Sequence, residues 1–320
     1  MRKIIRILLI LCFVLMLFSG CAPKSPPDSS NDSSPILPTP SFEKSPAASP
    51  PGETVLEASP SVSPSEEANV TVEELGIQIE ERYGVKLYWD QDSVEYGWSQ
   101  HPVSDFDALR SCLTLLDEQL ALYPENFFQQ FKSMGYPMEI MLTDLIINEE
   151  DEMADGRSDA NDTKTLVVLV VSEEMLGANY SSASNYTRFQ YVLHHEIGHT
   201  IYQHVCDFDN YETFDIYGEF LDFLPPDYSV GGTFIMDEEY QAYIPENDID
   251  NVYFCDSYAM SNLAENMASL FGYSMCPTPP WTFESPHVQD QLRYFFKAIR
   301  KVYGSSDWQA ETYWERVLHD

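Results

Sequence analysis

Basic residues are scarce in this sequence of 320 residues, which has 17 Lys and Arg against 52 Asp and Glu and a formal net charge of -35 at pH 7. Residues 68–320 hold 12 of the basic and 45 of the acidic residues. A surface of this sign repels phosphate backbones, so we expect no nucleic-acid partner. The acidity alone is typical of a soluble surface and identifies no partner.

Cysteine is also sparse, and none of the six cysteines is spaced as Cys-x-x-Cys. This disfavours a zinc site built from cysteines. The cysteines after the N-terminal segments described below can form up to two disulfides in an oxidising compartment, in three pairings that the sequence does not separate. They are Cys112, Cys206, Cys255 and Cys276.

An apolar run near the N-terminus, residues 7–18, follows three basic residues and is too short to favour a membrane span. Basic residues followed by such a run are typical of a secretory signal. The run ends at Phe18-Ser19-Gly20-Cys21, which resembles a bacterial lipobox, where small residues precede a cysteine that is lipidated after cleavage. We therefore predict a lipoprotein signal peptide over residues 1–20 and lipidation of Cys21. An ordinary secreted protein with an incidental cysteine is the alternative.

Pro and Ser make up about half of residues 22–67, where large apolar side chains are few. Such a segment cannot bury enough surface to offset the conformational entropy of folding. We expect residues 21–67 to be a solvated tether that holds the following domain, residues 68–320, away from the membrane. The sequence thus predicts an extracytoplasmic protein anchored to the bacterial cell membrane through the lipid on Cys21.

Residues 68–320 are rich in Tyr, Phe and Leu and long enough for one substantial core. Capping boxes and apolar spacing predict helices over 71–84 and 104–120 and strands over 85–89, 138–147 and 166–171. The acidic segment between the last two strands is interpreted as a solvated connection rather than a calcium loop. Ser104 is the expected cap of the second helix, and Ser184 or Asn185 that of the helix that carries residues 195–199. This order predicts an α+β fold in which a small mixed sheet covers an active-site helix, followed by a mainly helical C-terminal part.

The segment His195-Glu196-Ile197-Gly198-His199 has the HExxH spacing of a zinc hydrolase. Two imidazoles four positions apart on a helix lie on one face and can bind one metal ion. Glu196 is near enough to reach a water on that ion without ligating it, and is the candidate general base. The uncharged flanks suit a helix buried beneath a cleft, so the sequence predicts Zn2+ as the cofactor. A structural histidine pair is the alternative.

A catalytic zinc site needs a third protein ligand and an open position. Glu265 is the preferred candidate because residues 261–271 predict a helix capped by Ser261, whose small Ala264 and Ala268 would allow close approach to the first helix. Glu219, 20 residues after His199, is the alternative. Asp and Pro residues interrupt any helical pattern around Glu219, and a ligand needs a rigid mount.

Two short segments carry a resemblance to a known family. Phe-Cys-Asp-Ser-Tyr-Ala at 254–259 and Glu-Asn-Met-Ala at 265–268 are similar to the S-x-Y-A … E-D-x-A-E segment of the gluzincin metallopeptidases related to anthrax lethal factor and the Pro-Pro endopeptidases. Residues 79–87 resemble the opening helix and strand of those enzymes, so that the resemblance covers residues 72–304. It implies a zincin-like fold.

The resemblance also implies roles for individual residues. His195, His199 and Glu265 would be the zinc ligands, Glu196 the base, and Tyr258 a hydroxyl donor to the tetrahedral intermediate. Asn266 stands where Asp is usual in the family and Ser269 where an acid is usual. If the missing Asp supports a metal-bound histidine, the two departures predict lower zinc affinity or reduced activity.

The sequence as a whole predicts a membrane-anchored zinc metallopeptidase, an endopeptidase that hydrolyses a peptide or protein substrate with a zinc-activated water. The alternative is a catalytically weakened zinc-containing surface lipoprotein that acts in binding or adhesion, as the departures at Asn266 and Ser269 would allow. A tethered solute-binding lipoprotein fits Cys21 but leaves the HExxH segment unexplained.

Overall fold

The structure is a computed structural model that describes residues 70–95, 97–160, 165–177, 184–207, 219–226, 228, 243–304 and 308–319. Residues 71–320 form one compact unit, and the fold below is that of this unit. The predicted signal peptide, the lipidation site Cys21 and the tether lie outside the described residues. None of the helices described is both long and apolar enough to span a membrane.

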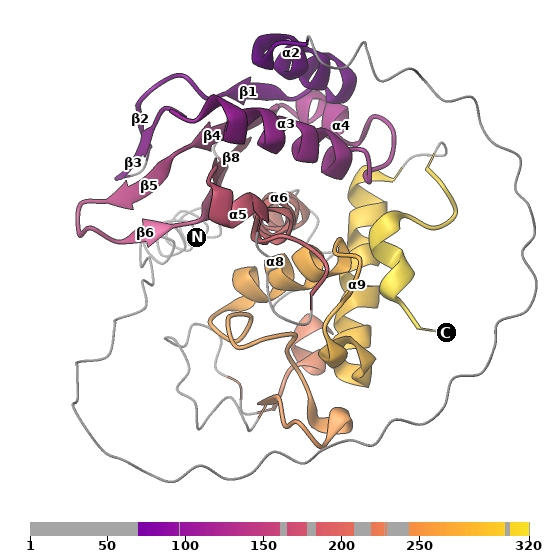
Figure 1. Ribbon diagram of the computed structural model, residues 1–320. Helices are drawn as coiled ribbons and strands as arrows, with labels where there is room; N and C mark the ends of the chain where they lie inside the picture. The colour runs from indigo at the N-terminus through magenta and orange to yellow at the C-terminus, as the bar shows by residue number, and fades with distance from the viewer. Residues whose placement is uncertain are drawn as a thin grey trace, which may run out of the picture. The chain divides into compact units, whose positions relative to one another are not determined.

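Two four-stranded sheets lie in the N-terminal part of the unit (Figure 1). The first is mixed, because its parallel strands β1, β4 and β8 are joined by the antiparallel edge strand β7. The second sheet is antiparallel, in the order β2-β3-β5-β6. The bounds are β1 Lys86–Tyr88, β2 Ser93–Glu95, β3 Trp98–His101, β4 Met138–Thr143, β5 Leu145–Asn148, β6 Met153–Ala154, β7 Gly156–Ala160 and β8 Thr165–Val170.

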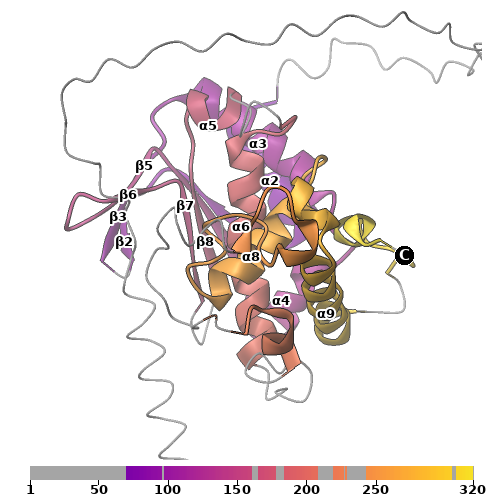
Figure 2. The ribbon, with the colours of Figure 1, turned by 90° about the horizontal axis from the view of Figure 1, so that it is seen from below.

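Strands β4 and β8 are almost entirely buried, which places them between two layers. Side chains alternate along a strand, so Ile140 and Val167 join the main core with the helices, while Met141 and Val168 point to the second sheet. Figure 2 shows this order, with the strands on one side of the unit and the helices on the other.

Three helices near the N-terminus cover the first sheet: α2 Val72–Tyr83, α3 Phe106–Leu120 and α4 Phe127–Ser133. The predicted start and end of α2 are confirmed, because Thr71 forms a capping box with Glu74 and Gly84 ends the helix at a φ of 74°. Helix α3 is capped by Asp105 rather than Ser104, since the Asp105 carboxylate accepts hydrogen bonds from two backbone amides of the first turn.

The central helix is α6, Arg188–Asp207, which carries the HExxH segment and follows the short α5, Glu173–Gly177. Helices α8, Leu263–Ser274, and α9, Pro286–Tyr303, pack beside it with short 3-10 helices. These are η2 Glu219–Phe223, η3 Ile249–Asn251, η4 Trp281–Glu284 and η5 Tyr313–Val317. The α+β class with a small mixed sheet over the HExxH helix and a mainly helical C-terminal part is thus confirmed.

Two further predicted caps were wrong by one to three residues. Helix α6 was expected to be capped by Ser184 or Asn185, but Thr187 and Gln190 bond reciprocally, side chain to backbone, at its start. Helix α8 is capped by Asn262 instead of Ser261. Ser, Thr and Asn all accept such bonds, so the sequence alone could not separate neighbouring candidates.

The strand predicted over 138–147 is two strands, β4 and β5, which belong to different sheets. The acidic segment predicted to be a solvated connection contains β6 and β7. Its charges are compensated locally, because Asp155 pairs with Arg188 and Asp159 lies 2.7 Å from Arg157. Once paired, these carboxylates no longer oppose strand formation at the edge of the first sheet.

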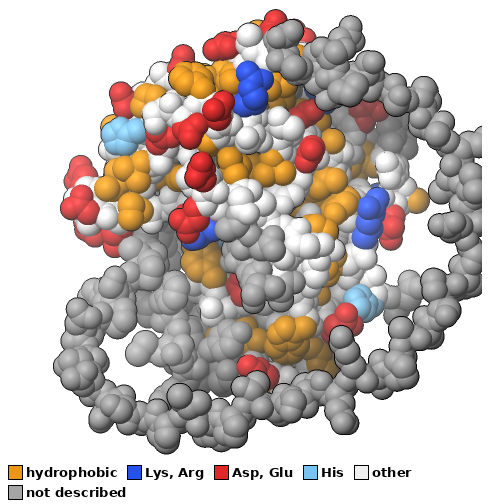
Figure 3. All heavy atoms as spheres, viewed as in Figure 1, with side chains coloured by type: hydrophobic (Ala, Val, Ile, Leu, Met, Phe, Trp, Pro, Cys, Tyr) orange, Lys and Arg blue, Asp and Glu red, His pale blue; other side chains and the backbone are white. Residues whose placement is uncertain are grey.

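The four cysteines that could have formed disulfides are free thiols in the structure: Cys112, Cys206, Cys255 and Cys276. Burial raises the pKa of the Cys112 and Cys276 thiols. On the surface that Figure 3 shows, acidic side chains outnumber basic ones, as the composition predicts.

Helices α6 and α8 approach closely at Gly198. A Cβ atom at this position would lie 3.0 Å from the Cα of Ala268 and 3.1 Å from the Cβ of Phe271. In the reverse direction, a Cβ atom at Gly272 would lie 3.3 Å from the Cα of His195. The predicted small residue Ala268 is therefore at the contact, but two glycines that the sequence did not single out make it possible.

Gly198→Val should lower the free energy of unfolding by about 1–3 kcal/mol, because the added methyl groups meet the backbone of α8 rather than a flexible side chain. Gly177→Val is the control, since a Cβ atom there meets nothing within 4 Å. Chemical denaturation measures both variants. Equal losses would show that α6 and α8 are not in close contact at Gly198.

A second prediction concerns the buried His204, whose Nδ1 lies 2.7 Å from the Tyr303 hydroxyl and whose Nε2 lies 3.3 Å from the Thr165 hydroxyl. Burial lowers the pKa of His204 from 6.5 to about 4, so the unfolded chain binds a proton first as the pH falls. The stabilisation is complete above pH ~6.5 and is lost as the pH falls to ~4.

His204→Gln should therefore flatten the dependence of the unfolding free energy on pH between about pH 6.5 and 4. Denaturant titrations of both proteins at several pH values in this window measure the slope. A variant with the wild-type slope would contradict the assignment of a neutral, buried His204.

Candidate metal centre

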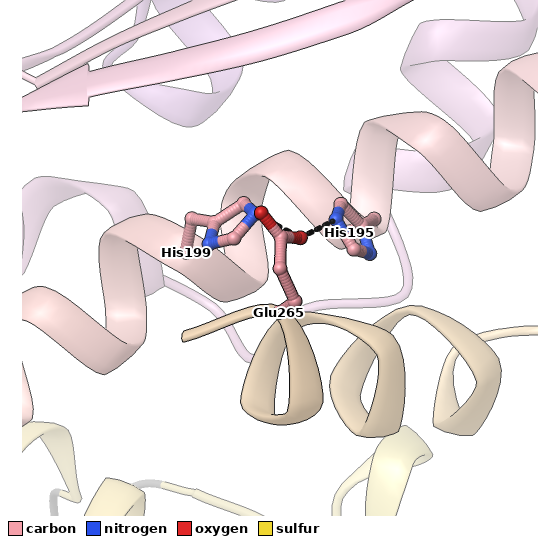
Figure 4. Close-up of side chains that lie close together, drawn as sticks. All are labelled: His195, His199 and Glu265. Atoms are coloured by element: carbon pink, nitrogen blue, oxygen red, sulfur yellow. Dashed lines mark hydrogen bonds and ion pairs between the residues drawn. The ribbon is translucent and has the colours of Figure 1, made fainter. Parts of the chain in front are cut away.

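Three side chains from two helices converge at one point, His195 and His199 on α6 and Glu265 on α8. One donor atom from each lies within 4.8 Å of the others, and no other such group of His, Cys, Asp or Glu occurs among the described residues. A single carboxylate oxygen of Glu265 lies 3.2 Å from the Nε2 atoms of both histidines. Figure 4 shows Glu265 reaching from α8 to the two imidazoles, which project from successive turns of α6.

Local structure explains why these side chains meet. Residues four apart on a helix share a face, and the imidazole centroids lie 4.7 Å apart. On the opposite helix, the side chain of Asn262 accepts a hydrogen bond from the backbone amide of Glu265 at 3.0 Å. This cap fixes the first turn of α8, and therefore the point from which Glu265 reaches the histidines.

The spacing of the donor atoms suits a metal ion. Ligand atoms of a tetrahedral ion with bonds of about 2.0–2.1 Å lie about 3.3 Å apart, close to the two observed spacings of 3.2 Å. Two imidazoles and one carboxylate are a donor set that first-row transition metals prefer. The residues present therefore fit such an ion, with three protein ligands and one remaining position.

The charges of the three groups are strongly coupled. Burial disfavours the protonated imidazole of His199, but the Glu265 carboxylate outweighs it and raises the pKa of His199 to about 9. Burial also opposes the ionised Glu265, and the two histidines nevertheless hold its pKa below the usual range. An ionised carboxylate between two imidazoles is thus favoured, which leaves a negative charge directed at the point where a cation would bind.

Glu196, the candidate base, lies between this group and the edge strand β7. Burial raises the pKa of its carboxyl, while the two histidines and a hydrogen bond from Ser158 on β7 oppose that change. A Cβ atom at Gly156 would lie 3.2 Å from an oxygen of Glu196 and 2.4 Å from Val192. Glycine at this position therefore lets β7 pass directly beside Glu196.

Tyr258, the predicted oxyanion donor, is also brought to the group. Its ring centroid lies 5.8 Å from that of His195, and the side chain is 39% exposed. The turn that carries it is held by Asp256, whose carboxylate accepts hydrogen bonds from the amides of Tyr258 and Ala259 and, at 2.9 Å, from the Tyr273 hydroxyl.

The two departures from the family pattern occupy different environments. Asn266 is fully buried and donates to Gln291 of α9 at 2.8 Å, so its amide faces α9. The hydroxyl of Ser269 accepts a hydrogen bond from Tyr191 at 3.3 Å, and the same Tyr191 hydroxyl lies 3.4 Å from the Nδ1 of His195. Of the two positions, Ser269 is thus the one connected to a candidate ligand.

Several residues around the group were not anticipated from the sequence, namely Ser158, Tyr191 and Asp256. Tyr191 lies four positions before His195, a helical spacing that could have revealed it. Ser158 and Asp256 become visible only when β7 and the turn before α8 are placed against α6. Glu219, the alternative third ligand, begins η2, and only its backbone is described.

Comparisons with known proteins give similarity in structure but none in sequence. No family model and no curated protein matches the sequence. Among solved structures, the chain is similar to a protein of Bacteroides caccae ATCC 43185 that is provisionally described as a zinc-binding metallo-peptidase. The identity is 14% and the TM-score 0.45, over 80% of this chain and 92% of the other. At this level of similarity, the site has to be interpreted from its own residues.

The choice between Glu265 and Glu219 gives a direct prediction. Glu265→Ala should abolish stoichiometric binding of zinc, because it removes the only carboxylate found within reach of both histidines among the described residues. Glu219→Ala is the matched control and should bind one ion per chain, as we expect of the wild-type protein. Equilibrium dialysis with metal analysis measures both. The reverse result would make Glu219 the third ligand.

Proposed function

We propose that residues 68–320 form a zinc-dependent metallopeptidase that hydrolyses peptide bonds. The observation that carries the proposal is the convergence of His195, His199 and Glu265, with the buried Glu196 beside them. Two histidines and a carboxylate with one remaining position form a donor set typical of catalytic zinc sites in peptidases. Calcium and magnesium prefer oxygen ligands, so the two imidazoles favour zinc.

The residues around the three candidate ligands have separate roles in hydrolysis. When bound, zinc would lower the pKa of a coordinated water and polarise the scissile carbonyl. Glu196 accepts the proton of the attacking water and passes it to the leaving amine. Its carboxyl has a pKa raised by burial, which makes it a stronger base than an exposed carboxylate. The partly exposed Tyr258 donates its phenol proton in a hydrogen bond to the developing oxyanion.

We further propose that the enzyme is an endopeptidase of the gluzincin type. A third ligand on the helix after HExxH agrees with that type, as do the motifs at 254–259 and 265–268 that resemble the enzymes related to anthrax lethal factor. The lipobox-like Cys21 and the Pro/Ser-rich tether support anchoring to the outer face of the bacterial cell membrane. The substrate would then be a peptide or protein in the same extracytoplasmic space.

The alternative function is a surface lipoprotein that binds zinc but has lost most of its activity. One observation favours it: Ser269, which is connected to His195 through Tyr191, stands where the related enzymes carry an acid. This alternative predicts stoichiometric zinc without cleavage of any member of a diverse peptide library. Cleavage of a library peptide that requires zinc would exclude it.

The role of Glu196 is tested by Glu196→Gln, which keeps the size of the side chain but removes its basicity. We expect the variant to bind zinc like the wild type and to lose about 100- to 10,000-fold in kcat, because it can no longer accept the proton of the attacking water. Turnover of a peptide found by library screening is the measurement. Glu118→Gln, on the exposed side of α3, is the control and should have wild-type activity. A fully active Glu196→Gln enzyme would rule out the mechanism.

A further inference from the structure

We propose that Tyr191, held by Ser269, is the positioning residue that orients His195 for the metal. The inference rests on the proposed function, in that it assigns a partner to one of the zinc ligands. Histidine ligands commonly donate their second ring N–H to a carboxylate or a carbonyl, which fixes the ring and its tautomer. No such carboxylate contact to His195 Nδ1 is found among the described residues, and a phenol lies there instead.

The geometry comes from both helices. Tyr191 precedes His195 by one helical turn on α6, and its ring centroid lies 5.6 Å from that of His195. Its hydroxyl lies 3.4 Å from the Nδ1 of His195 and 3.3 Å from the Ser269 hydroxyl on α8. All three side chains are buried, with Tyr191 6%, His195 5% and Ser269 0% exposed. The three side chains therefore form a contact between α6 and α8 that is shielded from solvent.

A phenol has one proton to donate, which determines how these groups connect. Tyr191 uses this proton in its hydrogen bond to Ser269. A hydrogen bond between the Tyr191 oxygen and His195 therefore requires an N–H at Nδ1. A proton on Nδ1 leaves the lone pair of a neutral imidazole on Nε2. Nε2 is the atom that lies 3.2 Å from Glu265, on the side of the candidate metal. With zinc on Nε2 the ring keeps its Nδ1–H, and the Tyr191 hydroxyl is placed to accept that hydrogen bond and hold the ring toward the metal.

Helix α8 has a surface that accommodates the Tyr191 ring. A Cβ atom at Gly272 would lie 3.2 Å from the Cε2 atom of Tyr191, so a larger residue would displace the ring. On its other side the ring contacts Tyr273, with centroids 4.5 Å apart. Gly272 and Ser269 are three residues apart on α8 and face α6 together. The same helix therefore leaves space for the ring and accepts its proton.

A neutral partner also suits the charges already present. Glu196, Glu265 and Asp256 lie close enough to the candidate ligands for a histidine to lower the pKa of each carboxyl. A further carboxylate at position 269 would add a buried negative charge beside them, at a cost in desolvation and repulsion. Two hydroxyl groups orient the imidazole without that charge. Ser269 is on this view a working replacement for the family acid rather than a sign of decay.

The experiment compares Tyr191→Phe, which keeps the ring and removes the hydroxyl, with the wild-type protein. Zinc affinity is measured by competition with a chromophoric chelator, and we expect the variant to bind zinc about 10- to 100-fold more weakly. NMR of the zinc-loaded protein should show an Nδ1–H proton of His195 that exchanges slowly with solvent in the wild type and faster in the variant, which has no phenol oxygen to accept it. Ser269→Ala should weaken zinc binding less, and should add nothing to Tyr191→Phe, because Ser269 acts through Tyr191.

The matched control is Tyr123→Phe. It removes a hydroxyl that lies 2.9 Å from the Nδ1 of His194, the buried neighbour of His195 that faces Gln119 instead of Glu265. This variant should lose stability but bind zinc like the wild type. A Tyr191→Phe protein with wild-type zinc affinity and wild-type exchange of the Nδ1–H proton, or an equal loss of affinity in Tyr123→Phe, would overturn the proposal.

The outcomes also separate this inference from the proposed function. If the wild-type protein binds zinc but cleaves no peptide, the proposed activity fails, while a weakened Tyr191→Phe still supports the positioning role. If the wild-type enzyme is active and Tyr191→Phe binds zinc unchanged, only the positioning role fails. A wild-type protein that binds no zinc overturns both.

Discussion

The close packing of α6 against α8 is the contact on which the candidate site depends. It joins two segments that are 70 residues apart in sequence, as measured between His195 and Glu265. Gly198 and Gly272 have no side chains that would separate the helices, and the backbone of Ala268 lies directly against Gly198. Without this approach, the HExxH helix would present two imidazoles and no third donor. The chemistry of the site is therefore a consequence of helix packing.

The same contact explains how buried charges are tolerated there. A carboxylate that leaves water needs compensation from charges or hydrogen bonds. The two imidazoles compensate Glu265, and the same imidazoles together with Ser158 compensate Glu196. Asp256 accepts hydrogen bonds from two backbone amides and from Tyr273. The imidazoles of α6 thus compensate two of the three acids, and β7, the turn before α8 and Tyr273 of α8 supply the remaining hydrogen bonds. A metal ion at the histidine pair would add positive charge at the point where these acids converge.

The sequence predicted those parts of the structure that have local signals. The capping box at Thr71, the α+β order and the HExxH helix each have such a signal, and Glu265 was preferred because a well-formed helix could carry it. The strand β7 was missed because the acidic composition of the segment around it argued for solvent exposure, whereas Arg157 and Arg188 pair with Asp159 and Asp155. The caps at Thr187 and Asn262 were missed because neighbouring residues are chemically equivalent.

The contacts that orient the candidate ligands were beyond the reach of sequence for a different reason. Tyr191, Ser158 and Asp256 are ordinary residues whose roles arise only from contacts between distant elements. Asn266 and Ser269 looked equivalent as departures from a motif, yet one faces α9 and the other connects to His195. Motif comparison identifies a missing acid, but it does not show which group has taken its place.

A crystal structure of the zinc-loaded protein, with anomalous diffraction at the zinc absorption edge, tests the central claim most directly. We predict one anomalous peak per chain, bonded to His195, His199 and Glu265 at about 2.0–2.2 Å, with one position left for water. A peak ligated by Glu219 or by a free cysteine, or no peak at the histidine pair, would contradict it.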